Sequence, residues 1–188
     1  LELGAGEPSQ KWKKWRRTGR VPKEILEKKQ SERPFFEFAI ALPVENRELP
    51  NSLFNYFPTL VGFDWPVLCH ATMDLTANRQ HLQDTPVNGF LVPKLAEFLA
   101  DVAMKQKSTS RPWEAMRLLS KTAALDLTLK KLGFFDALVK AAKERALVPT
   151  LSGQFAKPEE CRQISFSFGD WLPTDAFGDV VPEVEGWY

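Results

Sequence analysis

The alternating run of large apolar residues between positions 35 and 42 constrains the fold of this chain most strongly. Its sequence is FFEFAIAL, and proline stands on both sides of it, at Pro34 and Pro43. Successive side chains of an extended chain point to opposite faces, so four large apolar side chains share one face: Phe36, Phe38, Ile40 and Leu42. This period of two predicts a β-strand with one well-buried face. The chain therefore has to build a sheet beside a hydrophobic core.

Two further strands are expected after the first one. One covers SLFNYF at 52–57, and the other covers PVLCHATM at 66–73. Loops of modest length between three strands favour a largely antiparallel or mixed sheet. Ahead of the strands, PKEILEKKQ at 22–30 predicts a short helix with Pro22 in its first turn.

Helical spacing dominates the middle of the chain. Apolar residues recur at intervals of three and four over 87–106, where Pro93 marks a weak helix start. Two more helices are predicted at 113–132 and 134–147, divided at Gly133. For the first of these two, Ser110 is the expected N-cap, with Pro112 in the first turn. From residue 148 onward, scattered Gly and Pro predict extended segments and turns.

These elements predict an α+β fold: a small mixed or antiparallel sheet with covering helices, followed by a helical region and an extended C-terminal segment. Residues 1–10 are small, polar and punctuated by Gly and Pro, which is typical of a tail or linker. We expect an α+β domain over 11–107. The helical region and the extended segment then occupy 108–188.

Composition narrows the classes of partner. The 188 residues include 25 basic and 24 acidic ones, a formal charge of +1, so no global field favours nucleic acid or an acidic membrane. No apolar run approaches the roughly 20 residues that span a bilayer. The two cysteines, Cys69 and Cys161, form neither a disulfide framework nor a metal-binding spacing. Reduced thiols and a cytoplasmic location are therefore expected.

Motifs of an independent enzyme are absent from the sequence. It has neither a G-x-x-x-x-G-K-[ST] loop nor a G-x-G-x-x-G turn, so no ordinary phosphate cradle is expected. The two histidines, His70 and His81, are best interpreted as structural residues, and no metal site is predicted. We expect the isolated chain to be inactive.

The segment KWKKWRRTGR places aromatic residues among cations near the N-terminus. Trp12, Trp15, Arg16 and Arg17 are candidates for nucleic-acid contact, because interleaved aromatics and cations stack on bases and follow phosphates. The alternative is a basic edge segment whose tryptophans pack on the core. In a chain of nearly neutral charge, we favour packing.

The segment HATMDLTANRQHLQ, at 70–83, joins a strand to a polar turn. Its one arginine, Arg79, is followed by Gln83 one helical turn later. A turn held by a rigid scaffold is a common way to present one charge to a ligand. From the residues alone, a surface arginine that pairs with Asp74 or Asp84 is the favoured interpretation.

In that order, FFEFAIAL, LFNYFPT and HATMDLTANRQHLQ resemble the region that follows the nucleotide-binding domain in sacsin-like members of the GHKL ATPases. The resemblance covers about 35–99 and extends more loosely to Phe177, through VPTLSGQFAKPEE. In related heat-shock chaperones of the ninety-kilodalton class, a similar loop supplies an arginine to the terminal phosphate of ATP. Arg79 matches that arginine, and Gln83 matches a polar residue one turn after it.

The resemblance also implies that Thr76 and Asn78 lie near the cofactor. Thr76 stands where the chaperones have an asparagine, which is a departure from their pattern. ATP and Mg are implied only for a longer parent protein, in which a separate nucleotide-binding domain would be the partner of this chain. The resemblance thus implies a middle or transducer region that couples ATP hydrolysis to conformational change.

Two other classes of function stay open at this point. One is a non-catalytic module that binds protein partners through its helices. The other is a nucleic-acid-binding module of a defence or repair system, which would engage its ligand through residues 12–20.

Overall fold

The computed structural model describes residues 11–27, 34–45, 48–119, 125–164 and 180–182. The chain divides into two compact units. Unit 1 contains the described residues up to Asn88 together with 125–128, and unit 2 contains the other described residues. Whether 11–107 folds as one domain stays a prediction. No helix in the described ranges has the length and apolar character needed to cross a membrane.

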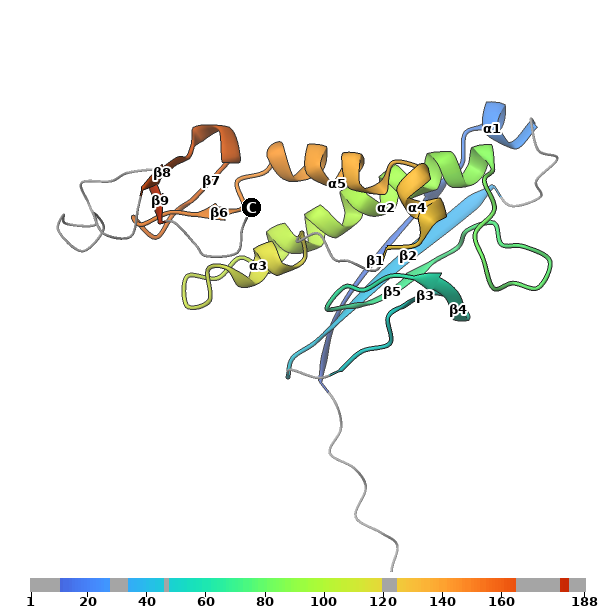
Figure 1. Cartoon of the computed structure of the whole chain (residues 1–188), viewed down its shortest axis with the longest axis horizontal. Helices are drawn as coiled ribbons and strands as arrows, with labels where there is room; N and C mark the ends of the chain where they lie inside the picture. Colours follow the sequence, from blue (N-terminus) through green and yellow to red (C-terminus); the bar gives the residue numbers. More distant parts are fainter. Residues whose placement is uncertain (1–10, 28–33, 46–47, 120–124, 165–179, 183–188) are drawn as a thin grey trace, which may run out of the picture. The chain divides into compact units, whose positions relative to one another are not determined.

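A mixed five-stranded sheet forms the centre of unit 1 (Figure 1). Its strands are β1 (Trp12–Arg20), β2 (Phe35–Pro43), β3 (Ser52–Asn55), β4 (Phe57–Gly62) and β5 (Leu68–Ala71), and helix α1 (Lys23–Glu27) joins β1 to β2. The strand order is β1-β2-β5-β3-β4. β5 and β3 are parallel, and the other neighbouring pairs are antiparallel. With the helices of unit 2, this sheet confirms the predicted α+β class.

The two faces of this sheet differ in character. Directly paired residues of neighbouring strands lie on the same face, because the side-chain period of a strand is two. On one face, Phe38, Ile40 and Leu53 are fully buried, together with Cys69. We call this the buried face. The other face, which we call the open face, carries the alternate residues of the same strands.

The strand predictions are confirmed for β2 and, over Leu68–Ala71, for β5, and the prediction at 52–57 was wrong. The single strand expected at 52–57 is a hairpin: β3 ends at Asn55, Tyr56 forms the turn, and β4 begins at Phe57. Tyr56 has a φ of 63°, a left-handed conformation that usually belongs to glycine. Because a tyrosine stands there, the sequence gives no turn signal. The basic segment of 12–20 forms β1 at one edge of the sheet, in agreement with the favoured interpretation of a basic edge segment.

Unit 2 is mainly helical and ends in short strands. Its elements are α2 (Pro86–Lys105) and α4 (Leu127–Lys131), which both begin in unit 1, and α3 (Glu114–Arg117), α5 (Phe134–Lys143), β6 (Val148–Pro149), β7 (Phe155–Ala156), η1 (Pro158–Glu160), β8 (Arg162–Ile164) and β9 (Val180–Pro182). Pro93 lies inside α2. The helix predicted at 87–106 is confirmed. It begins before Pro93, because the Thr85 hydroxyl accepts a hydrogen bond from the backbone N–H of Asn88 and so caps the first turn.

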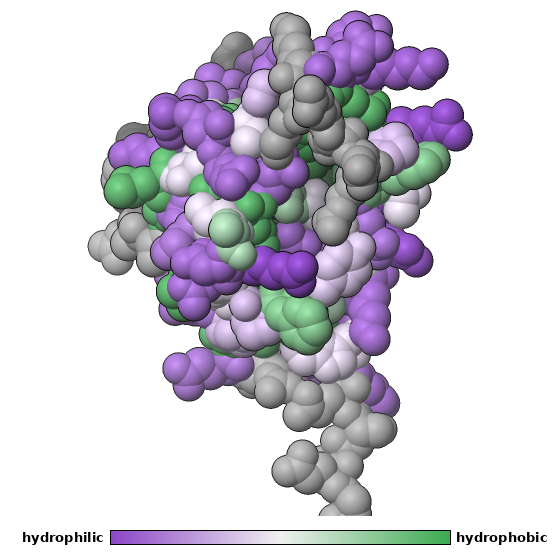
Figure 2. All heavy atoms as spheres, turned by 90° about the vertical axis from the view of Figure 1, so that its right-hand side faces the viewer, coloured by the Kyte–Doolittle hydropathy of each residue, from purple (hydrophilic) through white to green (hydrophobic). Residues whose placement is uncertain are grey.

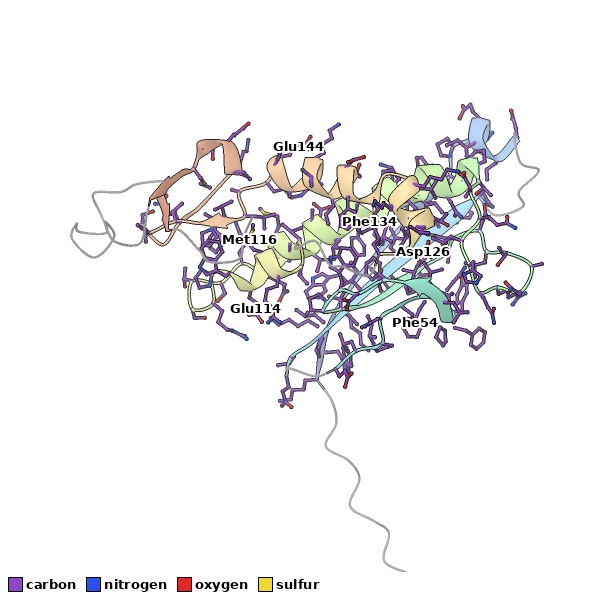
Figure 3. All side chains as sticks on the ribbon, viewed as in Figure 1. Phe54, Glu114, Met116, Asp126, Phe134 and Glu144 are labelled. Atoms are coloured by element: carbon purple, nitrogen blue, oxygen red, sulfur yellow. The ribbon has the colours of Figure 1, made fainter. Side chains whose placement is uncertain are left out.

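The helix expected at 113–132 is not continuous. Instead, α3 and α4 are short, and the Asp126 carboxylate caps α4 by accepting a hydrogen bond from the N–H of Thr128 at 2.8 Å. Ser110 is not the cap of α3, because its hydroxyl contacts that of Ser108 and the helix begins after Trp113. The prediction for α5 is confirmed over Phe134–Lys143, with Phe134 buried at its start (Figure 3). Of the predicted C-terminal extended segment, 165–179 and 183–188 lie outside the described residues, and the described part contains the short strands β6 to β9.

Candidate functional site

The segment from Asp74 to Gln83, which we call the Arg79 loop, directly follows strand β5 and the short connection 72–73. It is closed at its base by a β-bridge between Leu75 and Leu82. The backbone N–H of Thr76 donates to the carbonyl of His81 at 2.8 Å, and that of Arg79 donates to the carbonyl of Thr76 at 2.7 Å. The loop is therefore a tight hairpin with Arg79 at its tip.

Polar side chains brace this hairpin from within. The Thr76 hydroxyl donates to Oδ1 of Asn78 at 2.6 Å, and the same Oδ1 accepts a bond from the N–H of Gln80 at 3.1 Å. The Thr76 hydroxyl oxygen also accepts a bond from the N–H of His81 at 3.2 Å. Thr76 and Asn78, the two residues proposed to lie near a cofactor, thus fix the loop conformation in this structure.

Arg79 itself is exposed and conformationally strained. Its φ is 58°, in the left-handed region that costs a non-glycine residue about 1–2 kcal/mol. Within the described part of the chain, its guanidinium makes no hydrogen bond or ion pair. The expected pair with Asp74 or Asp84 is absent there, and Oδ2 of Asp74 instead accepts a bond from the Thr85 hydroxyl at 2.8 Å. The loop thus presents a free positive charge at its tip.

Two contacts hold the Arg79 loop on unit 1. The N–H of Leu60, in strand β4, donates to the carbonyl of Gln80 at 2.9 Å. At the base of the loop, the fully buried side chain of Asn88 accepts a bond from the N–H of Asp74 at 2.9 Å. The same side chain donates to the carbonyls of Asp74 at 2.8 Å and Gln83 at 2.7 Å. Asn88 therefore joins both ends of the loop.

Sequence reasoning missed Asn88. The available signal was a polar amide in the first turn of an amphipathic helix, two residues after Pro86. The spacing of Gln83 was also misinterpreted, since the segment between Arg79 and Gln83 is not helical. Gln83 lies at the loop base, where its N–H donates to the carbonyl of Asp74 at 3.1 Å. Arg79 and Gln83 thus belong to opposite ends of the hairpin.

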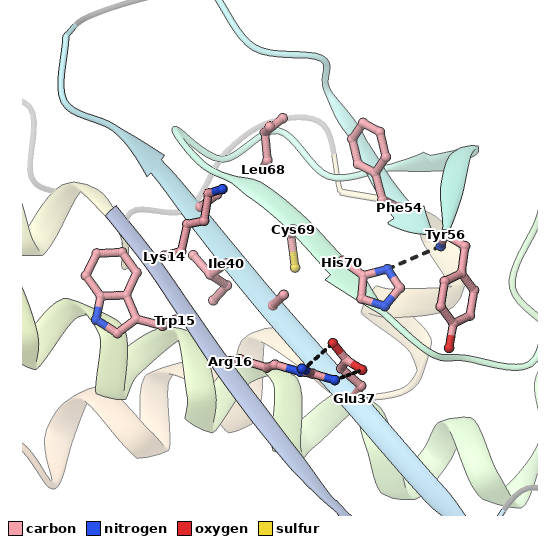
Figure 4. A pocket seen from close by; sticks show the side chains of 12 residues that line it. Lys14, Trp15, Arg16, Glu37, Ile40, Phe54, Tyr56, Leu68, Cys69 and His70 are labelled. Atoms are coloured by element: carbon pink, nitrogen blue, oxygen red, sulfur yellow. Dashed lines mark hydrogen bonds and ion pairs between the residues drawn. The ribbon is translucent and has the colours of Figure 1, made fainter. Parts of the chain in front are cut away.

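A second candidate site is a hollow of about 560 Å³ on the open face of the sheet (Figure 4). The small residues Ala39 and Ala41 form its floor, and larger side chains from four strands surround it. At one side, the Arg16 guanidinium forms a two-point ion pair with Glu37, with N–O distances of 2.6 and 2.7 Å. At the other side, the ring centroids of Tyr56 and His70 lie 5.0 Å apart.

The surroundings of His70 favour its neutral form. The backbone N–H of Tyr56 donates to Nδ1 of His70 at 3.2 Å, so the neutral ring carries its proton on Nε2. Burial lowers the pKa of His70 below its ordinary value, although the Glu37 carboxylate and the Phe54 carbonyl oppose this shift. On the buried face, burial raises the pKa of the Cys69 thiol, which keeps that thiol protonated and unreactive.

The structure divides the basic segment between the two faces. Trp15 pairs with Ile40 and Arg17 with Phe38, so both belong to the buried face, where they are half-buried. Arg16 pairs with Ala39 on the open face, and Trp12 pairs with Pro43 at the end of the strand. The four residues proposed as one nucleic-acid platform therefore do not share a surface.

Figure 2 shows one face of the molecule, on which hydrophilic side chains surround smaller apolar areas. Among the described residues, no group of three or more His, Cys, Asp or Glu side chains could hold a metal ion. No protein-family model, curated protein or solved structure matches this chain. Functional arguments consequently depend on the geometry of individual side chains.

Proposed function

We propose that this chain is the middle or transducer region of a GHKL-type ATPase, in which Arg79 acts on the terminal phosphate of ATP held by a separate nucleotide-binding domain. One observation carries the proposal: an exposed arginine without a described partner stands in a left-handed conformation at the tip of a braced loop. Backbone strain of this kind is often found at functional sites. The resemblance of residues 70–83 to the arginine-bearing loop of these ATPases is a second support.

The guanidinium is suited to this task by its shape and its charge. It is planar, remains protonated at any physiological pH, and binds two phosphate oxygens at once. In the proposed reaction, Arg79 stabilises the negative charge that develops on the transferred phosphoryl group. Because the guanidinium has no described ion pair, no such pair has to break before Arg79 binds the phosphate. The free-energy cost of moving Arg79 to the phosphate is therefore small.

A rigid loop makes the delivery depend on domain position. The hydrogen bonds of Thr76 and Asn78 make the loop rigid, and the bond from the N–H of Leu60 to the carbonyl of Gln80 ties it to the sheet of unit 1. Arg79 would then reach the phosphate only when unit 1 moves as a body toward the nucleotide-binding domain. ATP hydrolysis in the parent protein would therefore occur only when the two domains have closed on each other.

The described residues of this chain could contact the phosphate of ATP, but they offer no site for Mg. Arg79 offers a phosphate one positive charge, whereas the described residues offer a metal ion no cluster of ligands. The sequence also lacks a phosphate-binding loop. ATP and Mg would consequently be held by the other domain, and ATP would supply the phosphoanhydride bond that is cleaved.

Mutation of Arg79 in the longer parent protein tests the proposal. Arg79→Ala should lower ATP turnover about a hundredfold and leave nucleotide affinity nearly unchanged, because the group acts mainly on developing charge. A matched control is Arg111→Ala, which removes an exposed arginine of unit 2 that pairs with Glu114. Turnover that is equal in wild type and Arg79→Ala would assign Arg79 to structure alone.

A further inference from the structure

We propose that the open face of the five-stranded sheet binds a single-stranded polynucleotide, independently of the Arg79 loop. The binding surface consists of the 560 Å³ hollow and the adjoining ends of β1 and β2. Cations of β1 would contact phosphates, and aromatic rings of β2, β3 and the Tyr56 turn would stack on bases. This surface differs from the platform expected from sequence, because Trp15 and Arg17 lie on the opposite face.

The strand register arranges the surface in rows across the sheet. One row runs from Arg16 through Ala39 and His70 to Phe54, each residue being paired with the next. Neighbouring strands lie about 4.8 Å apart, so this row measures about 14 Å from its cation to its aromatic ring. A parallel row contains Lys14, Ala41 and Leu68. Cations thus occupy one edge of the hollow and aromatic rings the other.

The charge of the open face is complementary to phosphate. Strand β1 carries three cations on this face at alternate positions: Lys14, Arg16 and Arg20. Glu37 is the acidic residue on the paired positions of β2, and it neutralises Arg16. The Lys14 ammonium makes no hydrogen bond or ion pair within the described ranges, and the Arg20 guanidinium lies over the Phe35 ring at 4.9 Å. Two cations thus remain available to a polyanion.

Aromatic rings on this face are exposed to an unusual degree. The exposed fractions are 59% for Phe35 and 68% for Tyr56, and Phe54 is half-buried beside His70. Figure 4 shows the Phe54, His70 and Tyr56 rings along one side of the hollow. Bases stack on such rings whatever their sequence. Because Ala39 and Ala41 are small, the floor between the rings and the cations leaves room for a sugar-phosphate chain.

This combination favours a polynucleotide over an apolar peptide. An apolar partner would cover Lys14 and Arg20 without neutralising them, and buried charges without partners are costly. A single strand satisfies both requirements, since each nucleotide brings one phosphate and one flat ring. DNA and RNA share this chemistry.

Fluorescence anisotropy with the full 188-residue chain tests the proposal. The probes are labelled oligouridylate and oligothymidylate of about ten nucleotides. Two available cations predict a slope of about −1.4 for log affinity against log salt, so binding should weaken about sevenfold between roughly 50 and 200 mM salt. Either probe showing this saturable, salt-dependent binding supports the proposal.

Three sets of variants separate the parts of the surface. Lys14→Gln with Arg20→Gln should remove nearly all the salt dependence, and Tyr56→Leu or Phe35→Leu should weaken binding about tenfold at either salt concentration. Lys13→Gln with Arg17→Gln is the matched control, since it removes the same charge from the opposite face of the same strand. This control should bind as the wild type does. Circular dichroism tests whether each variant is folded. If Tyr56→Leu is not folded, Phe35→Leu replaces it as the aromatic variant.

Three results would overturn the proposal. The first is the absence of saturable binding of both probes at the lower salt concentration. The second is a loss of binding in the Lys13 and Arg17 control equal to that in the Lys14 and Arg20 variant. The third is equal affinity for a duplex of the same length, because paired bases cannot stack on the rings of the open face.

Discussion

Substitution of Arg79 by glycine and by alanine separates the backbone strain of the loop from the role of the side chain. Arg79 has a φ of 58° and makes no described hydrogen bond through its guanidinium. Arg79→Gly removes the strain of the left-handed conformation, about 1–2 kcal/mol, whereas Arg79→Ala retains it. Glycine loses about 0.5–1 kcal/mol of this gain, since it increases the entropy of the unfolded chain. Arg79→Gly should therefore be more stable than Arg79→Ala by about 0.5–1 kcal/mol.

Urea unfolding followed by tryptophan fluorescence measures this difference, because three of the tryptophans are in unit 1: Trp12, Trp15 and Trp65. The neighbouring position supplies the control. Gln80 is not among the described residues with positive φ, so there the order should reverse, with Gln80→Ala more stable than Gln80→Gly. An alanine variant at position 79 as stable as the glycine variant would refute the argument from strain.

Three further predictions concern other parts of unit 1 and the start of α2. Asn88→Ala should lower the free energy of unfolding by about 3 kcal/mol, measured by urea titration, because it removes the hydrogen-bond partner of part-buried backbone groups at both ends of the Arg79 loop. Gly19→Ala should lower the free energy of unfolding by about 1–3 kcal/mol, since a Cβ there would lie 2.5 Å from the Phe36 ring. Gly89→Ala, which has open space around it in helix α2, should instead raise the free energy of unfolding by up to about 1 kcal/mol. The third concerns pH: since the pKa of His70 is lowered in the folded protein, the unfolded chain binds more protons, and stability should fall as pH drops below about 6.5. In His70→Gln the decrease in stability at low pH should be smaller by the contribution of His70. Identical pH profiles of stability for the wild type and His70→Gln would contradict the lowered pKa of His70.

The sequence was sufficient wherever side-chain periodicity alone decided the structure. The alternation at 35–42 identified β2 and its buried face, and helical spacing identified most of α2 and α5. It was insufficient where a residue adopts a conformation that its type rarely favours. Tyr56 turns the chain in a left-handed conformation without glycine, which converted one expected strand into a hairpin.

Neither candidate site could be predicted in full from the sequence, because each depends on contacts between residues that are distant in the chain. The sequence located Arg79 through a resemblance, but the loop geometry depends on hydrogen bonds between residues as distant as Asp74 and Asn88. No local pattern encodes these contacts. On the open face, the register between β1 and β2 decides which cations lie together, and register is a property of strand pairing. A linear reading of residues 12–20 could not separate Arg16 from Arg17.

The most direct test of the central claim is the rate at which the parent protein hydrolyses ATP that is already bound. A single-turnover measurement compares wild type with Arg79→Gly, the variant in which the loop is expected to keep its stability. Our account predicts a hydrolysis rate about a hundredfold lower in Arg79→Gly, with the dissociation constant for ATP nearly unchanged. A wild-type rate in Arg79→Gly would contradict it, because the loop would then deliver no charge to the phosphate.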